Sequence, residues 1–165
     1  MTILVSDTSV LIDLERGDLI ACAFKLPATF VVPDVLYERE LRDYGGEELV
    51  RLGLKVESLD GDGVALAMRY MQAQRRLTVP DGFAFVLAKR NAWTLLTGDG
   101  PLRELAKAEG VDCHGVLWLL DESETQGAAT YVQLHRGLEG ISAHPRCRLP
   151  RREITIRLSR YAERL

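Results

Sequence analysis

Residues 2–12 read Thr-Ile-Leu-Val-Ser-Asp-Thr-Ser-Val-Leu-Ile, an apolar run that ends at Asp7 and continues with helical spacing. The apolar run at 3–6 predicts a short buried strand, and the spacing of apolar residues over 8–15 predicts a helix. This order places the carboxylate of Asp7 just beyond the end of a strand. In open parallel sheets, ligands bind at that edge.

The same alternation of strand and helix continues along most of the chain. Strand-like runs recur at 29–32, 55–59, 93–97 and 111–114, and helix-like stretches lie at 18–26, 34–43, 47–52, 60–76, 78–91 and 101–109. This pattern predicts an α/β fold with a central, mostly parallel sheet flanked by helices. The run at 55–59 alternates between apolar and polar residues, which indicates an edge strand.

After about residue 122 the pattern is only helical. We therefore expect one α/β domain over 1–122 and a helical C-terminal extension over 123–165, which packs on the body or on a partner. Ile154, Leu158, Tyr161 and Leu165 recur at helical spacing and predict one apolar stripe of a terminal helix.

Bulk composition is that of an ordinary globular protein, with 165 residues, 47% apolar and 27% charged. No uninterrupted apolar run is long enough for a membrane span, and the N-terminus lacks the basic region of a signal peptide. The three cysteines have the spacing of neither a disulfide framework nor a zinc site. We expect a cytoplasmic protein with free thiols and no membrane partner.

Charge is spread unevenly, although the net charge is only −3. Residues 141–165 hold seven arginines and two glutamates, so this segment carries +5 and the other 140 residues carry −8. The arginines fit two interpretations: they steer a nucleic acid, or they form a solvated helix face. An acidic body needs metal ions for any chemistry on phosphates.

Several acids follow or neighbour the predicted strand ends. Asp7 and Asp99 each come after a strand, and Asp81 begins the helix over 78–91. Two like charges at 4 Å repel by about 4 kcal/mol at an effective dielectric near 20, and a shared hard cation such as Mg²⁺ or Mn²⁺ relieves that cost. Each aspartate alone is equally well explained as a helix N-cap, so the metal-site hypothesis rests on the set.

Other catalytic motifs are absent from the sequence. It contains no phosphate-binding G-x-x-x-x-G-K-[ST] loop, no zinc-ligand spacing and no G-x-S-x-G nucleophile. A phosphatase of the haloacid-dehalogenase type needs a second aspartate where Ser9 stands. A receiver domain needs an acidic pair after the first strand, and Ser6-Asp7 supplies one acid only.

Four segments in order resemble the PIN-domain ribonucleases, in particular the bacterial and archaeal kind that includes toxins of type II toxin–antitoxin pairs. The likeness covers roughly residues 1–122. It is carried by Ser6-Asp7-Thr8-Ser9-Val10-Leu11-Ile12, by Asp34-Val35-Leu36-Tyr37-Glu38-Arg39-Glu40-Leu41, by Pro80-Asp81-Gly82-Phe83-Ala84 with Leu87-Ala88, and by Leu95-Leu96-Thr97-Gly98-Asp99-Gly100-Pro101-Leu102-Arg103.

The resemblance implies a three-layer PIN-like fold and an Mg²⁺- or Mn²⁺-dependent endoribonuclease. It implies that the metal ligands and catalytic acids are Asp7, Glu40, Asp81 and Asp99, with Glu38 as the alternative to Glu40. It also implies that Thr8 and Thr97 supply hydroxyls near the acids. The implied partners are an RNA substrate, a small antitoxin and a second copy of the chain.

Two positions depart from the family pattern. Asp99 is flanked by glycines where a second acid is common, and Gly82 stands where alanine is common. These departures leave open whether one metal ion binds or two. The alternative function is a catalytically weak PIN-like module that binds RNA or protein.

Overall fold

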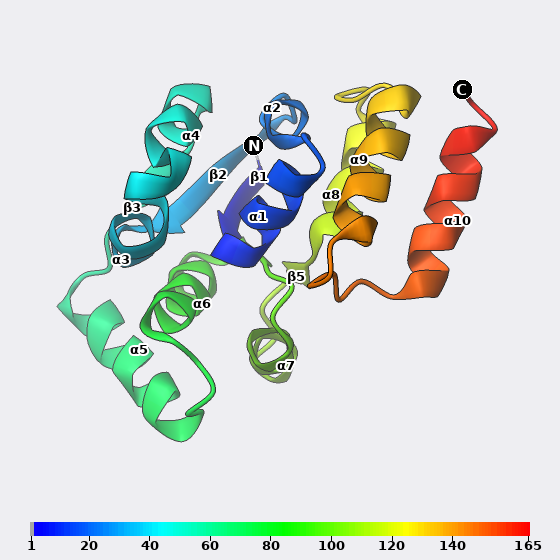
Figure 1. The fold of residues 1–165 in the computed structure, drawn as a ribbon. Coiled ribbons are helices and arrows are strands. Elements are labelled where there is room, and N and C mark those ends of the chain that lie inside the picture. The colour runs from blue at the N-terminus through cyan, green and yellow to red at the C-terminus, as the bar shows by residue number, and fades with distance from the viewer. Residues whose placement is uncertain (1) are drawn as a thin grey trace. The chain divides into compact units, whose positions relative to one another are not determined.

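The computed structural model describes residues 2–165 and contains a five-stranded parallel sheet flanked by helices (Figure 1). The chain forms two compact units, one from the N-terminus to Val10 with Pro27–Gly115, the other from Leu11–Leu26 with Val116–Leu165. The elements of the first unit are β1 (Thr2–Ser6), β2 (Ala28–Pro33), α3 (Asp34–Leu36), η1 (Tyr37–Gly46), α4 (Glu47–Leu52), β3 (Lys55–Glu57), α5 (Gly61–Ala73), α6 (Val79–Asn91), β4 (Thr94–Leu96), α7 (Gly100–Ala108) and β5 (Cys113–His114).

The sheet of the first unit has the strand order β3-β2-β1-β4-β5, and every neighbouring pair is parallel. Val5 of the central strand lies opposite Val31 on one side and Leu95 on the other. The α/β fold expected from the sequence is confirmed. The chain builds outward from β1 through β2 to β3, and then returns to the other side with β4. The strand order therefore reverses between β1 and β4, the position at which such sheets bind ligands.

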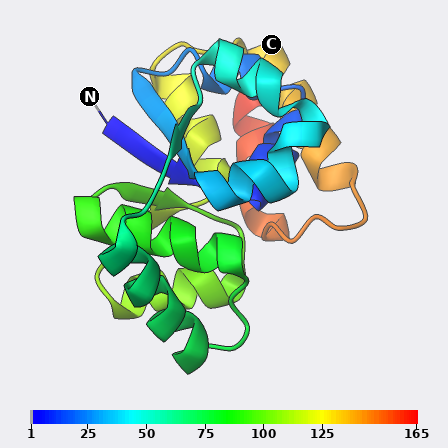
Figure 2. The same cartoon turned by 90° about the vertical axis from the view of Figure 1, so that its left-hand side faces the viewer.

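Helix α6 contacts β1, β2 and β4. Its residues Ala84, Phe85 and Ala88 are fully buried and join Val5 in one apolar core. Helix α5 packs along α6, with the rings of Tyr70 and Phe85 4.9 Å apart in an edge-to-face arrangement. Figure 2 shows α5, α6 and α7 gathered on one side of the strands. This packing explains why α6 is apolar on several faces.

The segment after β2 is less regular than the single helix expected over 34–43. Helices α3 and η1 run on to a break at Tyr44 and Gly45, where the backbone leaves helical geometry before α4 begins. Gly45 has φ +88°, a left-handed conformation that favours glycine. The expected end of the helix at the glycine pair is confirmed, and η1 carries Glu40.

The second unit is helical. Helix α1 (Thr8–Arg16) runs into it from the first unit, and the others are α2 (Ile20–Ala23), α8 (Val116–Thr125), α9 (Tyr131–Ala143) and α10 (Arg151–Ala162). Helix α8 contacts both α2 and α9, and α9 contacts α10. Ile154 and Tyr161 of the predicted stripe are buried, whereas Leu165 is 65% exposed because α10 ends at Ala162.

The domain bounds, the cysteines and the membrane were also subjects of expectations from the sequence. The compact units group 11–26 with the C-terminal helices, while a functional domain over 1–122 with an extension over 123–165 stays a prediction. The three cysteines are free thiols, and Cys22 is buried. No helix within residues 2–165 has the length and apolar character needed to cross a membrane.

Candidate active site

Asp7 lies directly after the central strand and is only 3% exposed. Its backbone N–H donates to the carbonyl of Leu96 at 2.9 Å, so the peptide sits between the ends of β1 and β4. Its Oδ1 accepts hydrogen bonds from the Ser9 hydroxyl at 2.7 Å and the Val10 amide at 3.1 Å. Its Oδ2 accepts a hydrogen bond from the Thr97 hydroxyl. Three donors therefore fix the orientation of one buried carboxylate.

Burial raises the pKa of Asp7 from 3.8 to about 6. The hydrogen bonds from Thr97, Ser9 and Val10 act in the opposite direction, because they stabilise the charged form. The charge of Asp81 adds to the rise in pKa. Asp7 is thus a carboxylate whose ionisation is disfavoured by its own surroundings, a condition common at functional sites.

The loop after β4 is tied to Asp7 by hydroxyl groups. Thr97 is fully buried, donates to Asp7 and accepts from the amide of Asp99 at 3.0 Å. The amide of Gly98 donates to the Ser9 hydroxyl at 3.1 Å. Since Ser9 also donates to Asp7, two hydroxyls link the ends of β1 and β4. The prediction that the Thr97 hydroxyl lies beside the acids is confirmed.

Asp81 lies in the first turn of α6 and is half-buried. Its Oδ2 accepts from the Thr78 amide at 3.2 Å, and its own amide donates to the Thr78 hydroxyl at 3.3 Å. Burial raises the pKa of Asp81, and the charges of Asp99 and Glu40 raise it further. Four acids from distant parts of the chain therefore influence one another at this edge of the sheet.

Glu40 and Glu38 occupy different surroundings on η1. The Thr8 hydroxyl, next to Asp7 in the chain, donates a hydrogen bond to Glu40 Oε2. Glu38 is exposed, and its carboxylate lies 2.9 Å from the guanidinium of Arg42. The structure therefore brings Glu40, and not Glu38, to the end of the central strand.

The helix-capping interpretation of the aspartates also holds. Asp7 caps the start of α1 through Val10, Asp81 forms a capping box, and Asp99 accepts from the Leu102 amide at 3.1 Å as the N-cap of α7. Capping uses one oxygen of Asp81 and one of Asp99. The other oxygens, with Glu40 Oε1, accept no hydrogen bond from residues 2–165. Capping and cation binding are therefore compatible roles.

The donor set suits a hard divalent cation, because it consists of carboxylate and hydroxyl oxygens. The charges that shift the pKa values of Asp7 and Asp81 belong to other carboxylates. As the side chains stand, no three His, Cys, Asp or Glu residues of the described chain converge into a ready metal centre. An ion at this edge therefore requires the half-buried acidic side chains to move closer together.

Sequence reasoning missed one member of the site, Ser9, which it named only as part of the first PIN-like segment and as the position where a haloacid-dehalogenase phosphatase has its second aspartate. Its hydroxyl donates to Asp7 and accepts from Gly98. The signal was its position two residues after Asp7 at a helix start, where hydroxyl side chains commonly hydrogen-bond to nearby groups. Gly82, the departure beside Asp81, fits close packing: a Cβ there would lie 2.8 Å from Met71 Cγ.

Comparisons with known proteins agree with the fold. A family model described as a PIN domain matches residues 3–163. Among solved structures, 17 chains match. One is a PilT N-terminus domain protein from the hyperthermophilic archaeon Sulfolobus solfataricus P2, with a TM-score of 0.50, 15% identity, and coverage of 74% of this chain and 93% of that chain. No curated protein matches the sequence.

Proposed function

Because this chain belongs to the PIN-domain family, we propose that it is an endoribonuclease that uses Mg²⁺ or Mn²⁺ to hydrolyse RNA phosphodiester bonds. PIN domains are in general nucleases that use divalent metal ions. The observation that carries the proposal is Asp7, a buried carboxylate at the point where the strand order reverses, with like charges as its ionic neighbours. A divalent cation removes the cost of that arrangement.

Asp7 is the central ligand in this proposal. The hydroxyls of Ser9 and Thr97 hold its two oxygens in fixed directions, which limits the motion lost on binding a cation. Asp81 and Asp99 supply further oxygens from two helix starts. When bound, the ion polarises the scissile phosphate and activates the attacking water.

Glu40 is the fourth acid. The Thr8 hydroxyl orients one of its oxygens and leaves the other for an ion or for a proton of the attacking water. Glu38 takes no part, because its carboxylate is paired with Arg42 on the exposed face of η1.

The cellular role that we propose is that of the toxin in a toxin–antitoxin pair, acting in the cytoplasm as a homodimer that a small antitoxin inhibits. The four-segment resemblance supports this role. An adjacent open reading frame that encodes a small protein with a DNA-binding head and a helical tail is the expected genomic context. Co-purification of the two proteins tests the pairing directly.

The test of the activity is metal-dependent cleavage. The purified chain is expected to cut RNA with Mg²⁺ or Mn²⁺ and to stop when EDTA is added. Asp7→Asn is expected to remove cleavage while the fold remains, as judged by circular dichroism. Cleavage by Asp7→Asn at the wild-type rate would show that the proposal is wrong.

A second candidate is a catalytically weak module that binds RNA or protein. The observation that favours it is that no three acids in the described residues already converge on a metal position. Such a module would retain RNA on a filter, with or without metal, and would release no products. The metal titration that detects cleavage therefore also separates the two candidates.

A further inference from the structure

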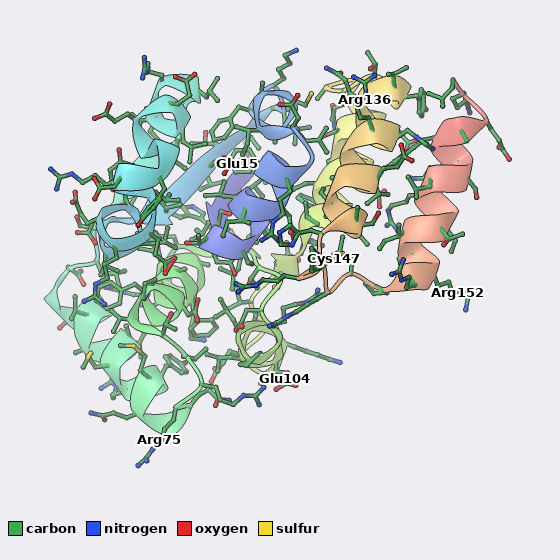
Figure 3. The ribbon with its side chains drawn as sticks, in the orientation of Figure 1. Glu15, Arg75, Glu104, Arg136, Cys147 and Arg152 are labelled. Atoms are coloured by element: carbon green, nitrogen blue, oxygen red, sulfur yellow. The ribbon has the colours of Figure 1, made fainter. Side chains whose placement is uncertain are left out.

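The segment between α9 and α10, together with the first turn of α10, carries a concentrated positive charge. It holds Arg146, Arg148, Arg151 and Arg152, which we name the arginine loop. All four side chains are exposed, and none forms an ion pair with another residue of the described chain. Figure 3 shows Arg152 projecting from the first turn of α10 into solvent.

Other arginines of the same unit behave differently. Arg157 lies 2.7 Å from Asp121 and 3.0 Å from Glu153, and Arg160 lies 2.7 Å from Glu124. These two side chains connect α10 to α8 and are neutralised within the fold. Two of the seven arginines are therefore paired within the fold and four are unpaired, while the guanidinium of Arg164 lies 5.8 Å from the ring centroid of Tyr131. The unpaired four form the concentrated charge that is available to a partner.

Nothing local offsets the charge of the arginine loop. Residues 140–152 contain no acid, and Glu153 is already bonded to Arg157. The loop leads into the positive end of α10, whose N-cap residue Pro150 provides no side-chain cap. Pro145, before Arg146, and Pro150, between Arg148 and Arg151, restrict the backbone, which limits the entropy lost when an anion binds.

We propose that the arginine loop binds the phosphate backbone of single-stranded RNA. One guanidinium group can bind two oxygens of a phosphate at the same time. Several cations within a few residues also match the repeating negative charge of a polynucleotide. The remainder of the chain carries −8 over residues 1–140 and repels RNA, so substrate capture needs a cationic surface of this kind. This inference deepens the proposed ribonuclease function and rests on it for the identity of the ligand.

The experiment measures binding of the full chain to a fluorescent single-stranded RNA in EDTA, where no metal-dependent cleavage occurs. Anisotropy is followed at several salt concentrations. The test variant changes all four arginines of the loop to glutamine. The matched control changes four other exposed, unpaired cations, all in the first unit, to glutamine: Lys55, Arg69, Arg75 and Arg76. Figure 3 shows Arg75 projecting from its loop in the same manner.

We expect the test variant to lose at least about tenfold in affinity at physiological salt, and its salt slope to fall by about 3, since each phosphate contact on a single strand contributes about 0.7. The control is expected to lose less than about threefold. A third variant with lysine at the four loop positions keeps the charge and is expected to bind nearly as well as the wild type. Thermal unfolding of all variants checks the fold.

Equal losses in the test and control variants would overturn the proposal, because binding would then follow net charge alone. Unchanged RNA affinity in the test variant would also overturn it. If that variant lost binding to vesicles of anionic lipid at the same time, the arginine loop would bind a lipid surface and not RNA. Because the assay needs no chemistry, a chain that binds through the arginine loop but never cleaves RNA would refute the proposed function and leave this inference intact.

Discussion

In the second unit, Asp121 accepts hydrogen bonds from Arg157 at 2.7 and 2.8 Å, whereas in the first unit the charges that act on Asp81 are those of Asp99 and Glu40. Both units place several acids close together. In the helical unit, each acid at the contact of α8 and α10 meets a guanidinium, and ion pairing raises the pKa of Arg157. At the sheet edge, the acids act on one another only through like charges, and burial raises the pKa of Asp7.

The difference predicts which acids stabilise the fold and which bind a metal ion in the proposed function. Removing one member of an ion pair leaves the other member as an uncompensated charge. We therefore expect substitution of a paired carboxylate to lower the free energy of unfolding. Carboxylates that repel one another weaken the fold, and such groups persist where function needs them. The comparison therefore assigns stability to one cluster and chemistry to the other, and substitutions in each can test that assignment.

The largest expected effect is on activity. Asp7→Asn is expected to reduce the RNA cleavage rate by at least about a hundredfold, since even outer partners of metal ligands typically contribute 10–100-fold. Asp121→Asn, the matched change in the second unit, is expected to leave the cleavage rate within about twofold and to lower the free energy of unfolding by about 1–2 kcal/mol. Rate assays and urea unfolding of both variants check that one substitution mainly lowers activity and the other mainly lowers stability. The comparison breaks if Asp121→Asn is the variant that loses activity.

The second effect is on stability as a function of pH. The pKa of Asp7 is about 6 in the folded chain and near 3.8 when unfolded, so the unfolded state loses its proton first and rising pH favours unfolding. In EDTA, the free energy of unfolding is expected to fall by about 2 kcal/mol between pH 4 and pH 6, and by about 3 kcal/mol over the whole titration, because of this group. Urea unfolding of the wild type and Asp7→Asn isolates the contribution. Identical pH profiles for the two proteins would contradict the assigned surroundings of Asp7.

A smaller effect separates the two glutamates of η1. Glu40→Gln is expected to weaken Mn²⁺ binding by about tenfold, because it removes one charged oxygen donor beside Thr8. Glu38→Gln is expected to change Mn²⁺ affinity by less than about twofold, since its carboxylate is exposed and paired with Arg42. Isothermal titration calorimetry on both variants decides the matter. A larger loss in Glu38→Gln would exchange the two roles.

The smallest effect concerns the helical unit. The hydroxyl of Tyr161 is buried without a hydrogen-bond partner among residues 2–165, and burial raises the pKa of Tyr161 to about 12. Tyr161→Phe removes this unsatisfied group and is expected to leave the free energy of unfolding unchanged or to raise it by up to about 1 kcal/mol. Thermal unfolding measures the change. Destabilisation by more than about 1 kcal/mol would reveal a partner for the hydroxyl.

Much of the first unit was predictable from local patterns. The apolar run before Asp7 and the helical spacing after it predicted β1 and α1. The alternating segment at 55–59 predicted an edge strand, and β3 occupies Lys55–Glu57 at the edge of the sheet. Hydrophobic periodicity depends only on residues close together in the chain, so it can be recognised in the sequence without knowledge of the fold. The carboxyl ends of parallel strands share one edge, which is why Asp7, Asp81 and Asp99 were expected together before any contact was known.

The sequence by itself determined the element order, the parallel sheet and the aspartates at its edge. Only the tertiary structure places Glu40, and not Glu38, beside Thr8, through a hydrogen bond that spans 32 positions. It also decided which arginines pair with α8, 36 positions or more away, and that residues 11–26 belong with the C-terminal helices. Two residues of the same type that lie near each other on a helix have the same local sequence pattern. Only their contacts with distant parts of the chain show which of them is paired or buried.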